Sequence, residues 1–224
     1  MAGLFVTLEG SEGTGKSSNI TLLTRFLQKN GWPVLSLREP GGTAVGEEIR
    51  SILKRIDIVP PPGPEAELLL FLASRAQLVR ERILPALQLG YVVLCDRYFD
   101  STVAYQGGAR SLDMATVRAI NRFATGGCIP DVTFLLDLPP EIGFRRIAAR
   151  LDGCRDRMEG EAMDFFHRVR ATYLQLATNE PQRFYTVDAG RPLPSVQREL
   201  RRILLTILES KGINPGQLAP RQWR

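Results

Sequence analysis

A phosphate-binding motif lies near the start of the chain. Residues 10–17 read Gly-Ser-Glu-Gly-Thr-Gly-Lys-Ser, which fills every fixed position of G-x-x-x-x-G-K-S, directly after an apolar run over residues 4–8. A glycine-rich turn that contains Lys-Ser by chance is the alternative, and the preceding strand and following helix disfavour it. The backbone N–H groups of such a loop surround a polyphosphate, the lysine neutralises the outer phosphates and the serine ligates Mg²⁺. The motif predicts a nucleoside triphosphate site formed by Gly10, Ser11, Glu12, Gly13, Thr14, Gly15, Lys16, Ser17 and Ser18.

A second candidate site is the pair Asp96-Arg97, which follows the apolar run of residues 91–95. An aspartate at a strand end beside a phosphate loop is a common place for a group that holds Mg²⁺ directly or through water. The arginine next to it matches a pair of phosphate oxygens. A surface ion pair is the alternative interpretation.

Arginines also gather at Arg150, Arg155 and Arg157, around Gly153. An arginine-rich segment of this kind can close over a triphosphate, exclude water and spread the charge of a transferring group. A solvated charged loop would have the same local sequence. We expect a lid over about residues 150–160.

An aromatic side chain and an arginine lie four residues apart at Phe71 and Arg75, so they share one face of a predicted helix. Stacking from the ring and hydrogen bonds from the guanidinium suit a nucleobase. Ordinary core packing is the alternative for Phe71.

Strand and helix patterns alternate along the chain and must position these groups. Apolar, β-rich runs cover residues 4–8, 34–37, 91–95, 132–138 and 184–187, and helical patterns cover residues 16–30, 45–54, 65–89, 112–124, 141–151, 162–178 and 195–210. Five strands with helical crossovers predict an α/β fold with a parallel sheet covered on both faces. The candidate groups follow strands, and ligands gather at the carboxyl ends of such strands.

Length and composition bound the class of protein. The chain has 224 residues with 44% hydrophobic and 24% charged residues, which is ordinary for a soluble globular domain. We expect one domain over residues 1–211 and a loosely held tail over residues 212–224. No apolar run is long enough for a membrane helix, and the chain begins directly with a strand rather than a signal peptide.

Charge and cysteine usage narrow the setting. The net charge is +5, but the basic residues form no block with interleaved aromatics, so we expect small phosphorylated anions as ligands rather than nucleic acid. Cys95, Cys128 and Cys154 are odd in number with no C-x-x-C pair, which favours a reduced, cytoplasmic setting without a cysteine metal site. The single histidine, His167, is expected on a helix surface.

Four motifs behind the phosphate loop, taken in order, resemble those of bacterial thymidylate kinases. They are Arg38-Glu39-Pro40-Gly41-Gly42-Thr43, Phe71-x-x-x-Arg75, Asp96-Arg97-Tyr98 and Ala104-Tyr105-Gln106-Gly107-Gly108. The resemblance runs from about residue 4 to residue 210. It implies a three-layer P-loop fold of the nucleoside monophosphate kinase kind, phosphoryl transfer from ATP·Mg²⁺ to dTMP, and a homodimer formed through helices after the second and third strands.

The resemblance also implies roles for individual residues around dTMP. Phe71 would stack on thymine, Arg75 would bond a ring carbonyl and Gln106 would reach the base edge. Tyr105 would crowd the sugar and disfavour a ribose 2′-hydroxyl, and Glu12 would accept from the 3′-hydroxyl. Further contacts with dTMP are implied for Glu39, Pro40, Arg50, Arg97 and Ser101, with Arg50 and Arg97 on its phosphate.

For the metal and the transferring phosphate, the resemblance implies a second set of residues. Glu9 would lie near the metal or the acceptor, beside the metal ligands Ser17 and Asp96. The variable positions of the loop hold no arginine, so the chain is similar to the group that includes the Escherichia coli enzyme, which uses lid arginines. The implied catalytic residues are Lys16, Arg97, Arg155 and Arg157, with Arg155 the first candidate for the γ-phosphate and Arg150 on ATP.

Two alternatives stay open at the level of the sequence. One is a kinase for another nucleoside monophosphate or for a deoxynucleoside, in which Glu9 or Asp96 would deprotonate a hydroxyl. The other is a nucleotide-dependent switch, which would need a guanine-reading N-K-x-D motif or a partner-binding domain; neither is apparent in the sequence.

Overall fold

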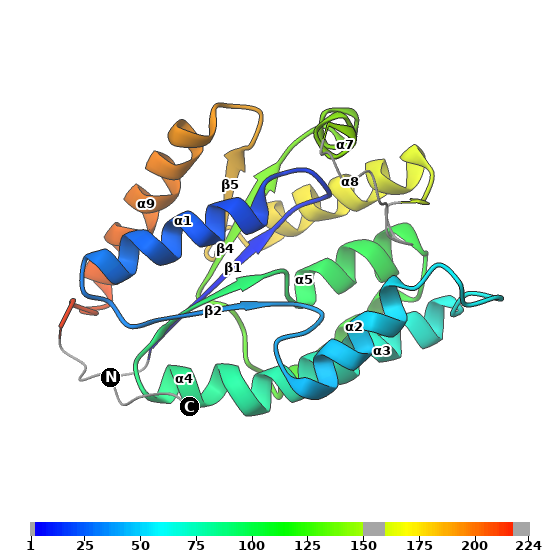
Figure 1. Cartoon of the computed structure of the whole chain (residues 1–224), viewed down its shortest axis with the longest axis horizontal. Helices are drawn as coiled ribbons and strands as arrows, with labels where there is room; N and C mark the ends of the chain where they lie inside the picture. Colours follow the sequence, from blue (N-terminus) through cyan, green and yellow to red (C-terminus); the bar gives the residue numbers. More distant parts are fainter. Residues whose placement is uncertain (1–2, 150–159, 217–224) are drawn as a thin grey trace.

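The computed structural model describes residues 3–149 and 160–216 (Figure 1). Its centre is a parallel sheet with the strand order β2-β3-β1-β4-β5. The strands are β1 (Leu4–Glu9), β2 (Val34–Arg38), β3 (Val92–Asp96), β4 (Val132–Asp137) and β5 (Phe184–Asp188). The predicted five-stranded parallel α/β fold is therefore confirmed.

The predicted strands match the observed ones to within one residue at each end because each is a short run of β-branched and apolar residues with both faces covered. β1 lies in the middle, paired with β3 on one side and β4 on the other, and every residue of β1 is buried. The loop after β1 therefore leaves the centre of the sheet, where its neighbours on both sides also end.

One face of the sheet is covered by α1 (Lys16–Lys29) and α9 (Leu193–Ser210), which lie side by side in Figure 1. The core beneath them is aliphatic. Leu23 and Leu27 from α1 and Leu200 and Leu204 from α9 are fully buried there against strand residues such as Val6.

The other face is covered by helices that carry much of the site. They are α3 (Pro64–Leu78), the π-helical turn η1 (Val79–Ile83), α4 (Leu84–Gln88), α6 (Met114–Thr125) and α8 (Met163–Asn179). The sequence pattern predicts one helix over residues 65–89, and the chain does stay helical there. A π turn interrupts it just before Pro85, because a proline has no N–H to continue the regular ladder.

A helical segment that the sequence analysis did not predict follows β3. It consists of α5 (Phe99–Thr102) and the π-helical η2 (Val103–Ala109). Two glycines make its helical pattern hard to recognise, and both face close neighbours. A Cβ at Gly108 would lie 2.0 Å from the Thr172 hydroxyl on α8, and one at Gly107 would lie 2.9 Å from the sulfur of Met114.

The remaining helices are α2 (Ala44–Lys54) and α7 (Pro140–Ala148). The Thr43 side chain caps α2 by accepting from the Gly46 N–H, and the Asp113 carboxylate caps α6 by accepting from the Thr116 N–H. None of the helices within residues 3–149 and 160–216 is long and apolar enough to span a membrane.

The start of the predicted loose tail is packed. Ile213 is buried in the core under α1 and α9, and its carbonyl accepts a hydrogen bond from the Trp32 indole at 3.3 Å. The tail therefore extends the domain past residue 211, at least as far as Ile213.

Candidate active site

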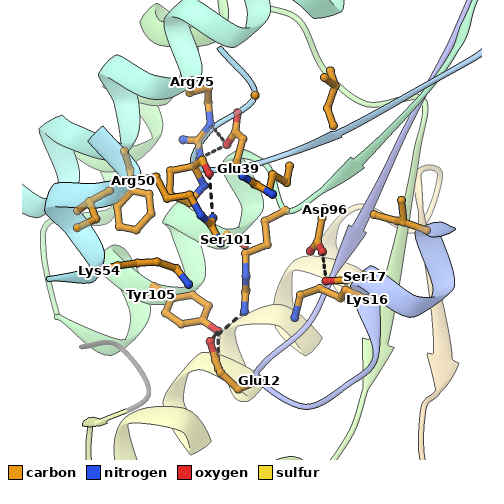
Figure 2. A pocket seen from close by; sticks show the side chains of 18 of the residues that line it. Glu12, Lys16, Ser17, Glu39, Arg50, Lys54, Arg75, Asp96, Ser101 and Tyr105 are labelled. Atoms are coloured by element: carbon orange, nitrogen blue, oxygen red, sulfur yellow. Dashed lines mark hydrogen bonds and ion pairs between the residues drawn. The ribbon is translucent and has the colours of Figure 1, made fainter. Parts of the chain in front are cut away.

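A cavity of about 780 Å³ opens at the carboxyl ends of β1, β2 and β3 (Figure 2). Of the residues predicted for the triphosphate, Glu12, Gly13, Gly15, Lys16, Ser17 and Ser18 line it, whereas Gly10, Ser11 and Thr14 form the loop behind these. Of those predicted for the acceptor, Glu39, Pro40 and Arg50 line it from the β2–α2 side, and Phe71, Arg75, Arg97, Ser101, Tyr105 and Gln106 line it from α3 and the segment after β3. Arg150, Arg155 and Arg157 lie outside the described residues.

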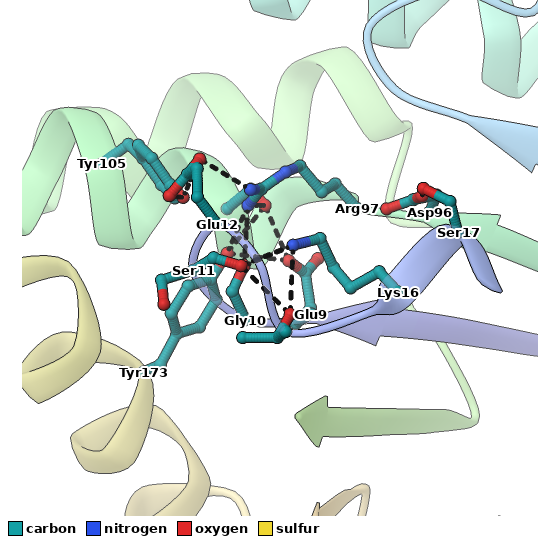
Figure 3. A network of polar contacts seen from close by, with 12 residues as sticks. Glu9, Gly10, Ser11, Glu12, Lys16, Ser17, Asp96, Arg97, Tyr105 and Tyr173 are labelled. Atoms are coloured by element: carbon teal, nitrogen blue, oxygen red, sulfur yellow. Dashed lines mark hydrogen bonds and ion pairs between the residues drawn. The ribbon is translucent and has the colours of Figure 1, made fainter. Parts of the chain in front are cut away.

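The phosphate loop is closed on its own lysine. Gly10, Gly13 and Gly15 have φ angles of 138°, 70° and 85°, which L side chains rarely adopt, so the loop can curl tightly before α1. Lys16 Nζ donates to the carbonyl oxygens of Gly10 at 2.9 Å and Ser11 at 2.7 Å (Figure 3). Burial and the nearby Arg97 charge lower the pKa of Lys16 to about 8.

A hydroxyl and a carboxylate meet beside this lysine. Ser17 Oγ donates to Asp96 Oδ2 at 2.6 Å, and both side chains line the cavity (Figure 2). Mg²⁺ takes oxygen ligands and, in phosphate sites, binds one or two protein groups and completes its shell with water and phosphate oxygens. Ser17 and Asp96 fit that donor set.

Arg97 connects the two halves of the cavity. Its backbone has φ 69°, a left-handed conformation that is uncommon outside glycine. The side chain reaches back to the phosphate loop, where it donates to the Gly10 carbonyl at 3.0 Å and to the Glu12 carboxylate at 2.9 Å. Tyr105 donates to the same Glu12 carboxylate at 2.7 Å, and the Arg97 guanidinium lies 4.9 Å from the Tyr105 ring centroid. The loop residue Glu12 is thus held by side chains from the acceptor side.

Glu9 lies behind Arg97 and does not line the cavity. It is fully buried, and its carboxylate accepts from the Tyr98 N–H at 2.7 Å, the Ser101 hydroxyl at 2.6 Å and the Tyr173 hydroxyl at 2.9 Å. Burial, together with the Asp100 carboxylate, raises the pKa of Glu9 to about 7. With three donors on its oxygens, Glu9 is placed to organise the segment after β3, and this geometry gives the predicted metal role no support.

Arg75 is held at the inner end of the acceptor half. It is only 1% exposed. Its Nε donates to Glu39 at 2.8 Å, and its Nη1 donates to Thr102 at 2.8 Å and to Asn121 at 2.7 Å. Burial raises the pKa of Glu39, although the Arg75 charge opposes that shift. Glu39 therefore fixes the arginine in this structure, and a direct contact of Glu39 with an acceptor stays a prediction.

The other acceptor residues fill the space between Arg75 and the loop. Phe71 lines the cavity one turn before Arg75 on α3, and its stacking on a base stays a prediction. Gln106 lines it from η2, and its Nε2 donates to Glu67 at 2.8 Å. Arg50 donates to the Pro40 carbonyl at 2.9 Å, which keeps this guanidinium at the cavity wall.

Several residues of this region were not singled out from the sequence. Tyr173 on α8 could only be found from the tertiary structure, because nothing in its local sequence marks it. The helical spacing could have identified Glu67, because it precedes Phe71 by the same four residues that separate Phe71 from Arg75. Arg146 on α7 contacts the carbonyls of Gly13, at 3.4 Å, and Ala189, at 2.9 Å.

Comparison with known proteins identifies the family of the chain. The thymidylate kinase family model matches residues 8–200. A thymidylate kinase of Pseudomonas fluorescens strain SBW25 is 46% identical over 214 residues, covering 93% of this chain and 98% of the relative. A thymidylate kinase of Carboxydothermus hydrogenoformans is 49% identical over 194 residues, covering 87% and 92%. One of Thermosipho melanesiensis is 42% identical over 206 residues, covering 92% and 100%. On this evidence, the chain belongs to the thymidylate kinase family.

Proposed function

We propose that this chain transfers the γ-phosphoryl group of ATP to dTMP, giving ADP and dTDP, and that it does so in the cavity between Lys16 and Arg75. The observation that carries the assignment to this cavity is its two-part construction. A phosphate loop forms one half, a pocket with an aromatic plate and a buried arginine forms the other, and Arg97 contacts both. Two substrates that must exchange a phosphoryl group need such adjacent sites.

The reaction needs charge stabilisation rather than proton abstraction. The acceptor atom is a phosphate oxygen that is already ionised at neutral pH. Catalysis then consists of positioning and of neutralising the charge on the equatorial oxygens. Lys16 and Arg97 line the cavity and contact the phosphate loop, so we propose that they supply this charge. Arg155 and Arg157, which lie outside the described residues, are proposed to add charge from the lid, and Arg150 to contact ATP.

For the metal, we propose Mg²⁺ held by Ser17 and Asp96. When bound, the ion would neutralise charge on the phosphate oxygens. The hydrogen bond between these two side chains places two oxygen ligands together beside the loop. Glu9 is not carried forward as a ligand, because it does not line the cavity and its carboxylate already accepts three hydrogen bonds.

For the acceptor, we propose that Arg97 and Arg50 bind the dTMP phosphate and that Phe71 stacks on thymine. Glu12, with Tyr105 on it, would accept from the 3′-hydroxyl. Arg75 and Gln106 would read the base edge.

A substrate panel tests the proposed reaction. ATP is supplied with dTMP, dUMP, dCMP, AMP or thymidine, and ADP release is followed by a coupled assay. We expect dTMP to give the highest kcat/KM. Faster turnover of thymidine than of dTMP would show a nucleoside kinase, and ATP binding without stimulation by any acceptor would show a nucleotide switch.

We also propose that the protein is a homodimer in the cytoplasm. Helix α2 packs on α3, and α3 packs on α6. Each of these helices carries exposed apolar side chains: Val45 and Ile52 on α2, Leu69 on α3, and Phe123, which is 89% exposed, on α6. Such a row favours a protein partner.

Light scattering should give twice the mass of the 25.0 kDa chain. Phe123→Ser combined with Leu69→Ser should shift it to the monomer mass, whereas Ile129→Ser, at an exposed position in the loop before β4, should not.

A further inference from the structure

Three side chains along one helix face reach the acceptor half of the cavity or its wall. Glu67, Phe71 and Arg75 follow one another at four-residue spacing on α3. Phe71 and Arg75 line the cavity, while Glu67 lies behind Gln106 and is only 1% exposed. A buried carboxylate in this position acts on a ligand only through the side chain in front of it.

The contact between Glu67 and Gln106 fixes the orientation of an amide. A side-chain amide has one accepting end and one donating end, whereas a carboxylate only accepts. Gln106 Nε2 donates to Glu67 Oε1 at 2.8 Å, so Oε1 is the end of the amide left for another partner. The reverse orientation would set two oxygens against each other at a buried place.

Arg110 keeps Glu67 in its accepting role. The guanidinium donates to both oxygens of Glu67 at 3.3 Å and pairs with Glu161 at 2.6 Å. Arginine stays charged and only donates, so the Glu67 carboxylate is held between two donor groups. The polarity of Gln106 is therefore set from behind, by residues outside the cavity lining.

Gln106 and Arg75 then present an acceptor and a donor from two residues that both line the cavity. Within the described part of the chain, four of the N–H groups of Arg75 are used, by Glu39 twice, Thr102 and Asn121. Of the five N–H groups of a guanidinium, one on Nη2 remains. An acceptor from Gln106 together with a donor from Arg75 would complement the N3–H and O4 of thymine or uracil, and would oppose the N3 and N4 amino group of cytosine.

We propose that Glu67 is a positioning residue for base selection. By holding Nε2 of Gln106 it presents Oε1 to the N3–H of the acceptor base, which favours thymine and disfavours cytosine. This inference rests on the proposed function.

Glu67→Gln tests the proposal because it reverses the polarity. Arg110 would keep an oxygen of the new side chain, whose amide nitrogen would then donate to Gln106 and turn the Gln106 nitrogen toward the base. We expect KM for dTMP to rise about tenfold, the ratio of kcat/KM for dTMP over dCMP to fall at least tenfold, and KM for ATP to stay unchanged.

Two further variants separate positioning from folding. Glu65→Gln removes the same charge from an exposed site on the same helix and should leave the selectivity ratio as in the wild type. The exchange Glu67→Gln/Gln106→Glu restores an acceptor facing the base, so it should recover most of the lost selectivity. An equal loss on dTMP and dCMP in Glu67→Gln, with an unchanged ratio, would show a merely structural role and overturn the proposal.

An analogue of dTMP with C–H in place of N3–H tests the wild-type protein directly. It should bind the wild type about tenfold more weakly than dTMP, and Glu67→Gln should not distinguish the two ligands. Equal affinity in the wild type overturns the inference even where a variant does not fold. A wild type that turns over no dTMP would instead contradict the proposed function, so the two failures are distinguishable.

Discussion

Gly143 of α7 lies so close to Gly13 of the phosphate loop that neither position has room for a side chain. A Cβ at Gly143 would be 2.3 Å from the Glu12 carbonyl oxygen, and a Cβ at Gly13 would be 2.2 Å from the Gly143 carbonyl oxygen. Arg146, almost one turn further along α7, donates to the Gly13 carbonyl. α7 therefore supports the loop from outside and fixes the path of its backbone.

Gly143→Ala should damage the triphosphate site selectively. The added methyl group must displace the loop backbone, which costs about 1–3 kcal/mol. We expect KM for ATP to rise about tenfold or more and binding of dTMP, measured by calorimetry, to weaken less, because Glu12 is the one proposed dTMP contact in the displaced loop. Gly160→Ala is the matched control, since a Cβ there meets nothing within 4 Å. An unchanged KM for ATP in Gly143→Ala would contradict the supporting role of α7.

ATP affinity should depend on pH through Lys16. The pKa of Lys16 in the free enzyme is lowered to about 8, and a bound triphosphate raises it by stabilising the ammonium. Affinity should therefore be constant below about pH 8 and fall about tenfold for each further pH unit. Titration calorimetry with a non-hydrolysable ATP analogue at pH 7 and 9 measures this. Lys16→Arg stays charged and should lose the dependence; a similar drop in that variant would point to another group.

The stability of the fold should depend on pH through Glu9. Its pKa is raised from 4.5 to about 7, so the folded state holds the proton more tightly than the unfolded state. The contribution of Glu9 to the free energy of unfolding is therefore full below about pH 4.5 and declines as the pH rises to about 7. Between pH 5 and 8 the wild type should lose on the order of 2 kcal/mol relative to Glu9→Gln, measured by urea unfolding. Glu48→Gln, at an exposed position, should show no such difference, and equal slopes for the wild type and Glu9→Gln would refute the assignment.

The two lid arginines, Arg155 and Arg157, should differ in how much their replacement lowers kcat. Arg155→Ala should lower kcat by as much as a few orders of magnitude and leave KM for dTMP nearly unchanged, as expected when a contact made in the transition state is lost. Arg157→Ala should lower kcat less than Arg155→Ala does, because Arg155 is the first candidate for the γ-phosphate. Steady-state kinetics with varied dTMP measures both. A steep rise of KM for dTMP at constant kcat in Arg155→Ala would mean that Arg155 binds the acceptor.

Much of the fold could be predicted because the strands are buried on both faces and read as short apolar runs. The clustering of Ser17, Asp96 and Arg97 followed from topology, since parallel strands end at one edge. The helical segment over Phe99–Ala109 could not be predicted from its pattern. Its glycines face α8 and Met114, and only these tertiary contacts explain them.

Side chains that act through other side chains were harder to predict from the sequence than those that line the cavity. Glu9 has the sequence position of a metal ligand, but its surroundings are set by Ser101 and by Tyr173, which is 164 residues away in sequence. Arg75 was expected at the base, and its buried partners Thr102 and Asn121 could not be foreseen from local spacing. Long-range pairing of this kind has no periodic signature in the chain.

The two carbonyl contacts of Lys16 have a consequence for how the enzyme captures ATP. The carbonyl oxygens of Gly10 and Ser11 already accept hydrogen bonds from the Lys16 ammonium, so a phosphate that binds the ammonium must replace these contacts. A polyphosphate offsets their loss, because it also engages the loop N–H groups along its length. The two carbonyl contacts thus hold the ammonium at the turn of the loop before α1, beside the N–H groups that surround a polyphosphate.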